Sequence, residues 1–228
     1  MTALLASVRS IEEALDAARA GADLIDLKEP HAGALGGVEV HEIARIVRRL
    51  RAEYAARPIS ATIGDLPDHA LDEMTTRVLK VAATGVDYVK VGISTEAALK
   101  HLSSVPAVTV PVLLSDRGID HKLALMTAEL RFPAIVFDTA LKDGRTLFDC
   151  VSFEALRECV RELRARGVMT GIAGSLGWND RDSIRAIAPD FAGFRGALCS
   201  GHAGRHDRKG KLDPSLVSRW AHALHSNS

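Results

Sequence analysis

Eight short apolar runs alternate with longer helical patterns along the whole chain of 228 residues. Each run is almost continuously apolar, which is typical of parallel strands covered on both faces by helices. The runs lie at residues 3–8, 24–28, 59–63, 88–92, 110–114, 134–138, 168–173 and 191–195. Eight strands with crossover helices in about this length predict a (β/α)8 TIM barrel, with residues 1–228 forming a single domain.

Signals for helix boundaries agree with this alternation. Ser10-Ile-Glu-Glu13 predicts a capping box in which Ser10 begins the first helix, and Gly21 is predicted to follow that helix. Similar signals predict further helices at residues 71–84, 153–166 and 213–224. The longest loops are predicted at residues 67–72 and 199–211.

Composition excludes several classes of partner. The 29 basic and 29 acidic residues give a formal net charge of zero, so the chain carries no electrostatic sign of nucleic-acid binding. No apolar stretch approaches the ~18 residues of a membrane-spanning helix, and the N-terminus does not resemble a signal peptide. The three cysteines form no cluster, which fits a reducing compartment. We therefore expect a cytoplasmic protein with neither a nucleic-acid nor a membrane partner.

Lysine is rare in this chain, with eight lysines against 21 arginines, yet three lysines lie at or just after the ends of predicted strands. They are Lys28, Lys90 and Lys142. Lysine, unlike arginine, can lose its proton near neutral pH and attack a carbonyl carbon. These positions predict amine chemistry at the carboxyl ends of the strands, where the reactive groups of TIM barrels lie. The structural alternative is that these lysines form ion pairs with Asp26, Asp87 and Asp138.

Asp26 and Lys28 are two residues apart on one predicted strand, so both side chains are expected to point into the barrel. Asp138 ends another strand and is expected at the same mouth. Neighbouring cations and partial burial lower the pKa of a lysine from its usual value near 10.4, which favours attack on an aldehyde or ketone. For Asp26, direct proton transfer and an ion pair that only positions Lys28 remain equally open.

Glycine-rich segments follow the seventh and eighth predicted strands. Backbone N–H groups in these loops commonly bind phosphate in TIM barrels, and glycine allows the backbone to approach the ligand closely. Ser175 and Arg195 would add side-chain contacts. Tight connections without a ligand are the alternative. The predicted phosphate site consists of Gly174, Ser175, Arg195, Gly196 and Ala197.

The loop at residues 199–211 is basic and contains His202, Arg205 and His206. A metal site is less favoured there than a solvated basic loop that could meet a second phosphate, because no carboxylate or cysteine lies at ligand spacing. We therefore expect no metal and no other cofactor.

Several segments resemble the (5-formylfuran-3-yl)methyl phosphate synthases, in the same order and over nearly the whole chain. Residues 95–131 are more divergent, and no role is assigned to them. The resemblance is carried by Ile25-Asp-Leu-Lys-Glu-Pro30, Gly33-Ala-Leu-Gly36, Ser60-Ala-Thr-Ile-Gly-Asp65, Asp87-Tyr-Val-Lys-Val-Gly92, the segment from Asp138 to Asp149, Ala173-Gly-Ser175 and Arg195-Gly-Ala197.

This resemblance implies a TIM-barrel lyase that condenses two molecules of glyceraldehyde 3-phosphate, without a cofactor, into the furan precursor of methanofuran. Phosphate and water are released. It implies a Schiff base on Lys28 and a proton-accepting role for Lys90, with Asp26, Asp138 and Lys142 also at the active site. Barrels of this type often associate, so a homo-oligomer is expected. The alternatives are another Schiff-base aldolase or isomerase acting on triose or sugar phosphates, and a non-catalytic sugar-phosphate sensor.

Overall fold

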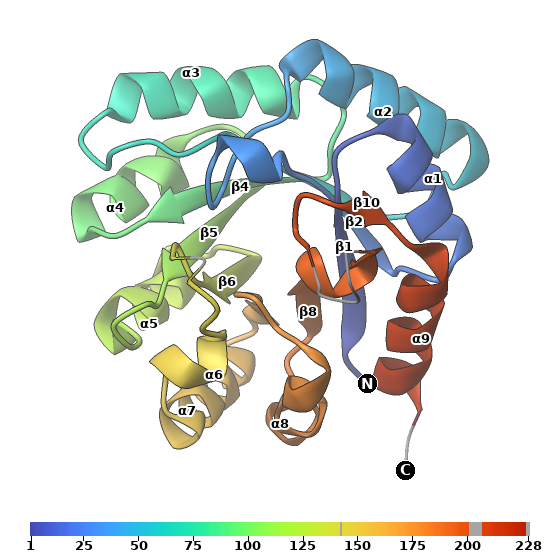
Figure 1. Ribbon diagram of the computed structural model, residues 1–228. Coiled ribbons are helices and arrows are strands. Elements are labelled where there is room, and N and C mark those ends of the chain that lie inside the picture. Colours follow the sequence, from blue (N-terminus) through green and yellow to red (C-terminus); the bar gives the residue numbers. More distant parts are fainter. Residues whose placement is uncertain (142, 201–206, 227–228) are drawn as a thin grey trace.

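The computed structural model describes residues 1–141, 143–200 and 207–226, and Figure 1 shows a ring of helices around a central barrel. Eight parallel strands pair in sequence order, and β1 closes the barrel against β8. The predicted (β/α)8 barrel is therefore confirmed. The strands are β1 (Ala3–Val8), β2 (Leu24–Leu27), β3 (Ile59–Thr62), β4 (Tyr88–Ile93), β5 (Thr109–Leu114), β6 (Ala134–Asp138), β7 (Met169–Ile172) and β8 (Phe191–Phe194).

Helices cover the outside of the barrel, and the last of them, α9, contacts β1, α1 and α8 (Figure 1). The helices are α1 (Ile11–Arg19), α2 (Val40–Glu53), α3 (Leu71–Ala82), α4 (Glu96–Ser104), α5 (His121–Glu129), α6 (Leu147–Cys150), α7 (Phe153–Ala165), α8 (Arg181–Ile187) and α9 (Pro214–His225). None of the helices in the described ranges is both long and apolar enough to cross a membrane.

The start of α1 confirms one part of the predicted capping box and corrects the other. Ser10 Oγ accepts the Glu13 N–H at 3.2 Å, and Gly21 follows the helix with φ of 101°. The Glu13 side chain does not return to the Ser10 N–H; it accepts the Arg9 N–H at 3.1 Å instead. Glu13 is buried, so its carboxylate belongs to a tertiary contact rather than to the helix cap alone.

The predicted loop lengths need a correction. The connection from β2 to α2, residues 28–39, is longer than the loop at 67–72 and contains the 3₁₀ helix η1 (Pro30–Ala32). Within residues 199–211, β9 (Cys199–Ser200) pairs antiparallel with β10 (Lys211–Leu212), and η3 (Gly196–Leu198) precedes them. The other short helix is η2 (Trp178–Asp180).

Two apolar layers hold the barrel. The larger lies between the strands and the surrounding helices. The smaller fills the lumen and includes Leu5, Val112, Val136 and Phe191. Gly171 leaves room for Phe191, because a Cβ at Gly171 would lie 2.1 Å from the Phe191 ring. This apolar filling closes the lower lumen, and the ionisable side chains of Asp26, Lys90 and Asp138 lie above it, at the carboxyl ends of the strands.

Candidate active site

A cavity of about 330 Å³ opens at the carboxyl ends of the strands. Its walls combine two kinds of residue that the sequence singled out. Ionisable side chains come from β2 and the residue that follows it, from β4 and from β6, and glycine-rich backbone comes from the segments after β7 and β8. The ionisable residues are Asp26, Lys28, Lys90 and Asp138, and the predicted phosphate residues are Gly174, Ser175, Arg195, Gly196 and Ala197.

Asp26 and Lys90 form the deeper of two ion pairs. Lys90 Nζ lies 2.7 Å from Asp26 Oδ1, and both side chains are buried. Ser7 Oγ donates to Asp26 Oδ2 at 3.0 Å, and Ser60 Oγ donates to Oδ1 at 2.7 Å. Burial alone would raise the pKa of Asp26, but the charges of Lys90 and Lys28 and these hydrogen bonds outweigh it and hold the pKa below its ordinary value of 3.8. Asp26 is therefore a carboxylate at neutral pH.

Lys28 and Asp138 form the second pair, with Lys28 Nζ 3.4 Å from Asp138 Oδ2. The other oxygen, Asp138 Oδ1, accepts the Thr139 N–H at 2.7 Å. The Lys28 side chain is 13% exposed, against 9% for Lys90, and its contact is the longer of the two. Of these two lysines, Lys28 is thus the more exposed and has the longer contact to its carboxylate.

These contacts correct two of the pairings considered from sequence. Asp26 contacts Lys90 at hydrogen-bonding distance, so its direct ion pair is not with Lys28. Asp87 pairs with Arg51, at 2.6 Å between Oδ2 and Nη2, and also accepts the Ile59 N–H. Lys28 pairs instead with Asp138, one of the three aspartates named from the sequence without an assigned lysine.

The loop after β7 has an unusual backbone. Gly174 and Ser175 are consecutive residues with φ of 106° and 51°. A Cβ at Gly174 would lie 3.0 Å from side-chain atoms of Thr139 and 3.1 Å from its backbone N. In the described part of the chain, the N–H groups of these two residues and of Gly196 and Ala197 donate to no acceptor. Four N–H groups therefore remain for a ligand at the cavity, as an anion site requires.

Arg195 is held by a network on the outer side of the cavity. Its Nη1 and Nη2 donate to both oxygens of Glu13, at 2.6 and 3.1 Å. Its other three N–H groups donate to backbone oxygens of Ser7, Arg208 and Gly210. All five guanidinium N–H groups are thus in use, and the predicted side-chain contact of Arg195 with phosphate would require one of these bonds to break.

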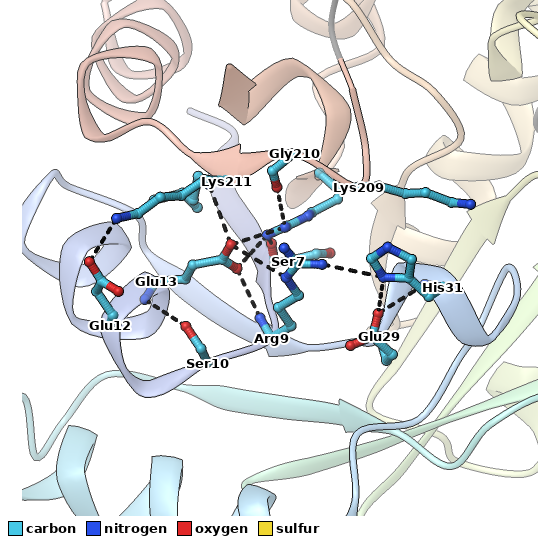
Figure 2. Close-up of polar contacts among 12 residues, drawn as sticks. Ser7, Arg9, Ser10, Glu12, Glu13, Glu29, His31, Lys209, Gly210 and Lys211 are labelled. Carbon is cyan, nitrogen blue, oxygen red and sulfur yellow. Dashed lines mark hydrogen bonds and ion pairs between the residues drawn. The ribbon is translucent and has the colours of Figure 1, made fainter. Parts of the chain in front are cut away.

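Figure 2 shows the Glu13 carboxylate between Arg9 and the segment that carries Gly210 and Lys211. Glu13 accepts hydrogen bonds from the backbone N–H groups of Arg9 and Leu212 in addition to Arg195. Burial would raise the pKa of Glu13, but the hydrogen bond and charge of Arg195 outweigh it and hold the pKa below its ordinary value of 4.5. Sequence reasoning missed this contact; the feature that could have indicated a buried partner is a charged glutamate among the buried positions of α1, although it does not name Arg195.

The long loop after β2 is fixed by residues that sequence reasoning did not assign. Asp65 Oδ1, which follows β3, accepts the Leu35 N–H at 3.2 Å, and a Cβ at Gly33 would collide with Asp65. From the other side, Arg208 Nη2 donates to Pro30 O at 2.6 Å and to Gly33 O at 2.8 Å. Arg208 also lines the cavity. No local motif marks Arg208 in the sequence.

Four residues singled out from the sequence, Lys142, His202, Arg205 and His206, lie outside the described residues. The backbone before Lys142 is held by Asp116, which accepts the N–H groups of Ala140 and Leu141 at 2.8 Å each. Among the residues that the structure does describe, no group of three or more His, Cys, Asp or Glu side chains could hold a metal ion.

The model of the 4-HFC-P synthase family matches residues 4–221. The chain belongs to this family. It is 33% identical over 240 residues to the (5-formylfuran-3-yl)methyl phosphate synthase of Methanopyrus kandleri, covering 97% of this chain and 98% of that protein. It is 30% identical over 240 residues to the enzyme of the same name from Archaeoglobus fulgidus, covering 97% and 99%. The likeness predicted from the motifs is therefore confirmed over nearly the full length.

Solved structures with low sequence identity share the fold of this family member. Phosphoribosyl anthranilate isomerase from Thermus thermophilus superimposes with a TM-score of 0.67 at 12% identity, covering 98% of each chain. KGPDC from Streptococcus mutans gives a TM-score of 0.62 at 13% identity, covering 98% of this chain and 97% of that one. At these identities the likeness supports the barrel alone.

Proposed function

We propose that this family member is a lyase that condenses two molecules of glyceraldehyde 3-phosphate into (5-formylfuran-3-yl)methyl phosphate through a Schiff base on Lys28. The product would serve methanofuran biosynthesis. One observation carries this proposal: two Lys–Asp pairs, Lys28 with Asp138 and Lys90 with Asp26, face one cavity that is also lined by open backbone N–H groups. An amine nucleophile and an anion site are what a phosphorylated aldehyde requires.

The amine of Lys28 attacks the aldehyde carbon of one triose phosphate, and loss of water gives an iminium. The iminium withdraws electrons and acidifies the adjacent carbon. Removal of that carbon's proton gives an enamine, whose electron pair expels the phosphate from the third carbon as its C–O bond breaks. Bond formation to the second triose, dehydration and release from Lys28 complete the furan. The atoms balance with release of one phosphate and two water molecules overall.

The two Lys–Asp pairs have different duties in this scheme. Asp138 holds the Lys28 amine toward the cavity until the substrate arrives. Lys90 lies deeper beside Asp26, and this pair accepts and returns the protons of the carbon adjacent to the iminium. Asp26 is kept in position by Ser7 and Ser60, so that it can move a proton without moving itself. We include Lys142 among the proton-transferring residues on the resemblance alone.

Incubation with glyceraldehyde 3-phosphate, followed by mass spectrometry and ultraviolet absorption of the product, tests this function. A furan aldehyde phosphate should appear with the wild-type protein and be absent with Lys28→Arg. Aldol or isomer products without a furan would support the alternative, another Schiff-base aldolase or isomerase. Tight binding of the triose phosphate without any turnover would contradict both enzyme hypotheses and favour a non-catalytic sugar-phosphate sensor.

A further inference from the structure

Not every cationic side chain that lines the cavity contacts a carboxylate among the described residues. Three of its cations in the described ranges face a carboxylate: Lys28 contacts Asp138, Lys90 contacts Asp26, and Arg195 contacts Glu13. Arg208 also lines the cavity and has no carboxylate partner in the described part of the chain. Its neighbour Asp207 is exposed, and that carboxylate accepts the Lys209 N–H.

Some N–H groups of the Arg208 guanidinium donate no hydrogen bond within the described part of the chain. Nη2 donates to Pro30 O and Gly33 O, while Nε and Nη1 make no hydrogen bond to any described residue. The arginine therefore crosses from the segment after β8 to the loop after β2, which carries Lys28. The backbone of Arg208 lies beside Gly196, since a Cβ on Gly196 would be 3.7 Å from the backbone N of Arg208, and both residues line the same cavity.

Arg195 holds the backbone of Arg208 and of the residues that follow it. Arg195 Nε donates to Arg208 O at 3.0 Å, and Arg195 Nη2 donates to Gly210 O at 2.8 Å. Glu13, which holds Arg195, also accepts the Leu212 N–H. The Glu13 carboxylate and the Gly210 oxygen both accept hydrogen bonds from the Arg195 guanidinium, and Figure 2 shows these two acceptors near each other. The buried ion pair of Glu13 and Arg195 thus fixes the segment that carries Arg208, an arginine that contacts no carboxylate among the described residues.

We propose that Arg208 binds a substrate phosphate and thereby selects phosphorylated over unphosphorylated aldehydes. This inference rests on the proposed function and names the residue that gives the site its preference. A phosphate dianion accepts bidentate hydrogen bonds from a guanidinium, and the N–H groups of Gly196 and Ala197 complete its coordination. Arg195, by contrast, positions Arg208 and does not contact the ligand.

Three proteins decide the matter: wild type, Arg208→Gln, and Lys209→Gln, which removes an adjacent exposed cation. Calorimetric titration with inorganic phosphate should show at least about tenfold weaker binding by Arg208→Gln and no change for Lys209→Gln. Borohydride trapping of unphosphorylated glyceraldehyde on Lys28 should be equal in all three proteins. Equal phosphate affinity of wild type and Arg208→Gln would overturn the proposal.

The proposal would also be overturned if Arg208→Gln lost both glyceraldehyde trapping and phosphate binding. Arg208 would then only support the loop that carries Lys28. If Arg208→Gln does not fold, Arg208→Lys replaces it, and its phosphate affinity should fall several-fold because the fork of donors is lost. Wild-type affinity in Arg208→Lys would count against the proposal. The phosphate titration does not require turnover. A negative result in the test for furan synthesis therefore does not change the outcome of the Arg208 test.

Discussion

Asp26 on β2 contacts Lys90 on β4 at 2.7 Å, although Lys28 lies only two residues away on the continuation of its own strand. The pairing leaves Lys28 with the longer contact, 3.4 Å to Asp138. The two lysines therefore differ in how firmly their amines are held, and the proposed mechanism gives them different steps for this reason.

We predict that the covalent intermediate forms on Lys28. Borohydride reduction during turnover should leave a stable adduct on the peptide that contains Lys28, located by peptide mass spectrometry. Lys28→Arg should abolish both adduct and product because a guanidinium stays protonated. Lys90→Arg should still allow trapping while product formation stops. An adduct that maps to Lys90 instead would reverse the roles assigned to the two lysines.

Substitution of Asp26 should separate Schiff-base formation from the later proton transfers. Asp26→Asn removes the carboxylate that holds Lys90, so turnover should fall by about 100-fold or more, which is the scale of general acid–base catalysis. Trapping on Lys28 should persist. Ser60→Ala, which removes one hydrogen bond from Asp26, serves as the milder control. Loss of trapping in Asp26→Asn would mean that Asp26 also activates Lys28.

Two glycines of the predicted phosphate site should respond differently to alanine. Gly196 has no positive φ, and its Cβ would meet only ordinary contacts at 3.7 Å or more. Gly196→Ala should fold normally and raise KM with little change in kcat, as loss of ground-state binding does. Gly174→Ala should lower kcat and stability as well, because its Cβ would push on Thr139, whose N–H holds Asp138. Steady-state kinetics and thermal unfolding check both variants.

The pair of Glu13 and Arg195 should make stability depend on pH. The pKa of Glu13 in the folded protein lies below its ordinary value of 4.5. The unfolded chain therefore binds more protons, so the stabilisation is fully present above about pH 4.5 and is lost as the pH falls through the folded value. Glu13→Gln should cost about 3–5 kcal/mol at pH 7, because Arg195 stays buried without its carboxylate. The difference in free energy of unfolding between wild type and Glu13→Gln, measured by urea unfolding, should become smaller as the pH falls below about 4.5.

The positions of the strands and the inward direction of Asp26 and Lys28 could be predicted from sequence, because apolar runs and the two-residue period of a strand are local properties. The partner of each lysine could not, since it depends on how strands far apart in the chain meet in the closed barrel. The same limit hid the contact of Glu13 with Arg195. Arg208 escaped notice because its role follows from a loop geometry that no local pattern encodes.

The closure of the barrel also shapes how the chain can be made in a cell. β1 pairs with β8, and Glu13 on the first helix accepts the N–H of Leu212, close to the end of the sequence. During synthesis, one edge of β1 therefore stays unpaired and exposed until β8 has left the ribosome. We expect a nascent chain that stops before β8 to depend on a chaperone, whereas the complete chain can shield that edge by itself.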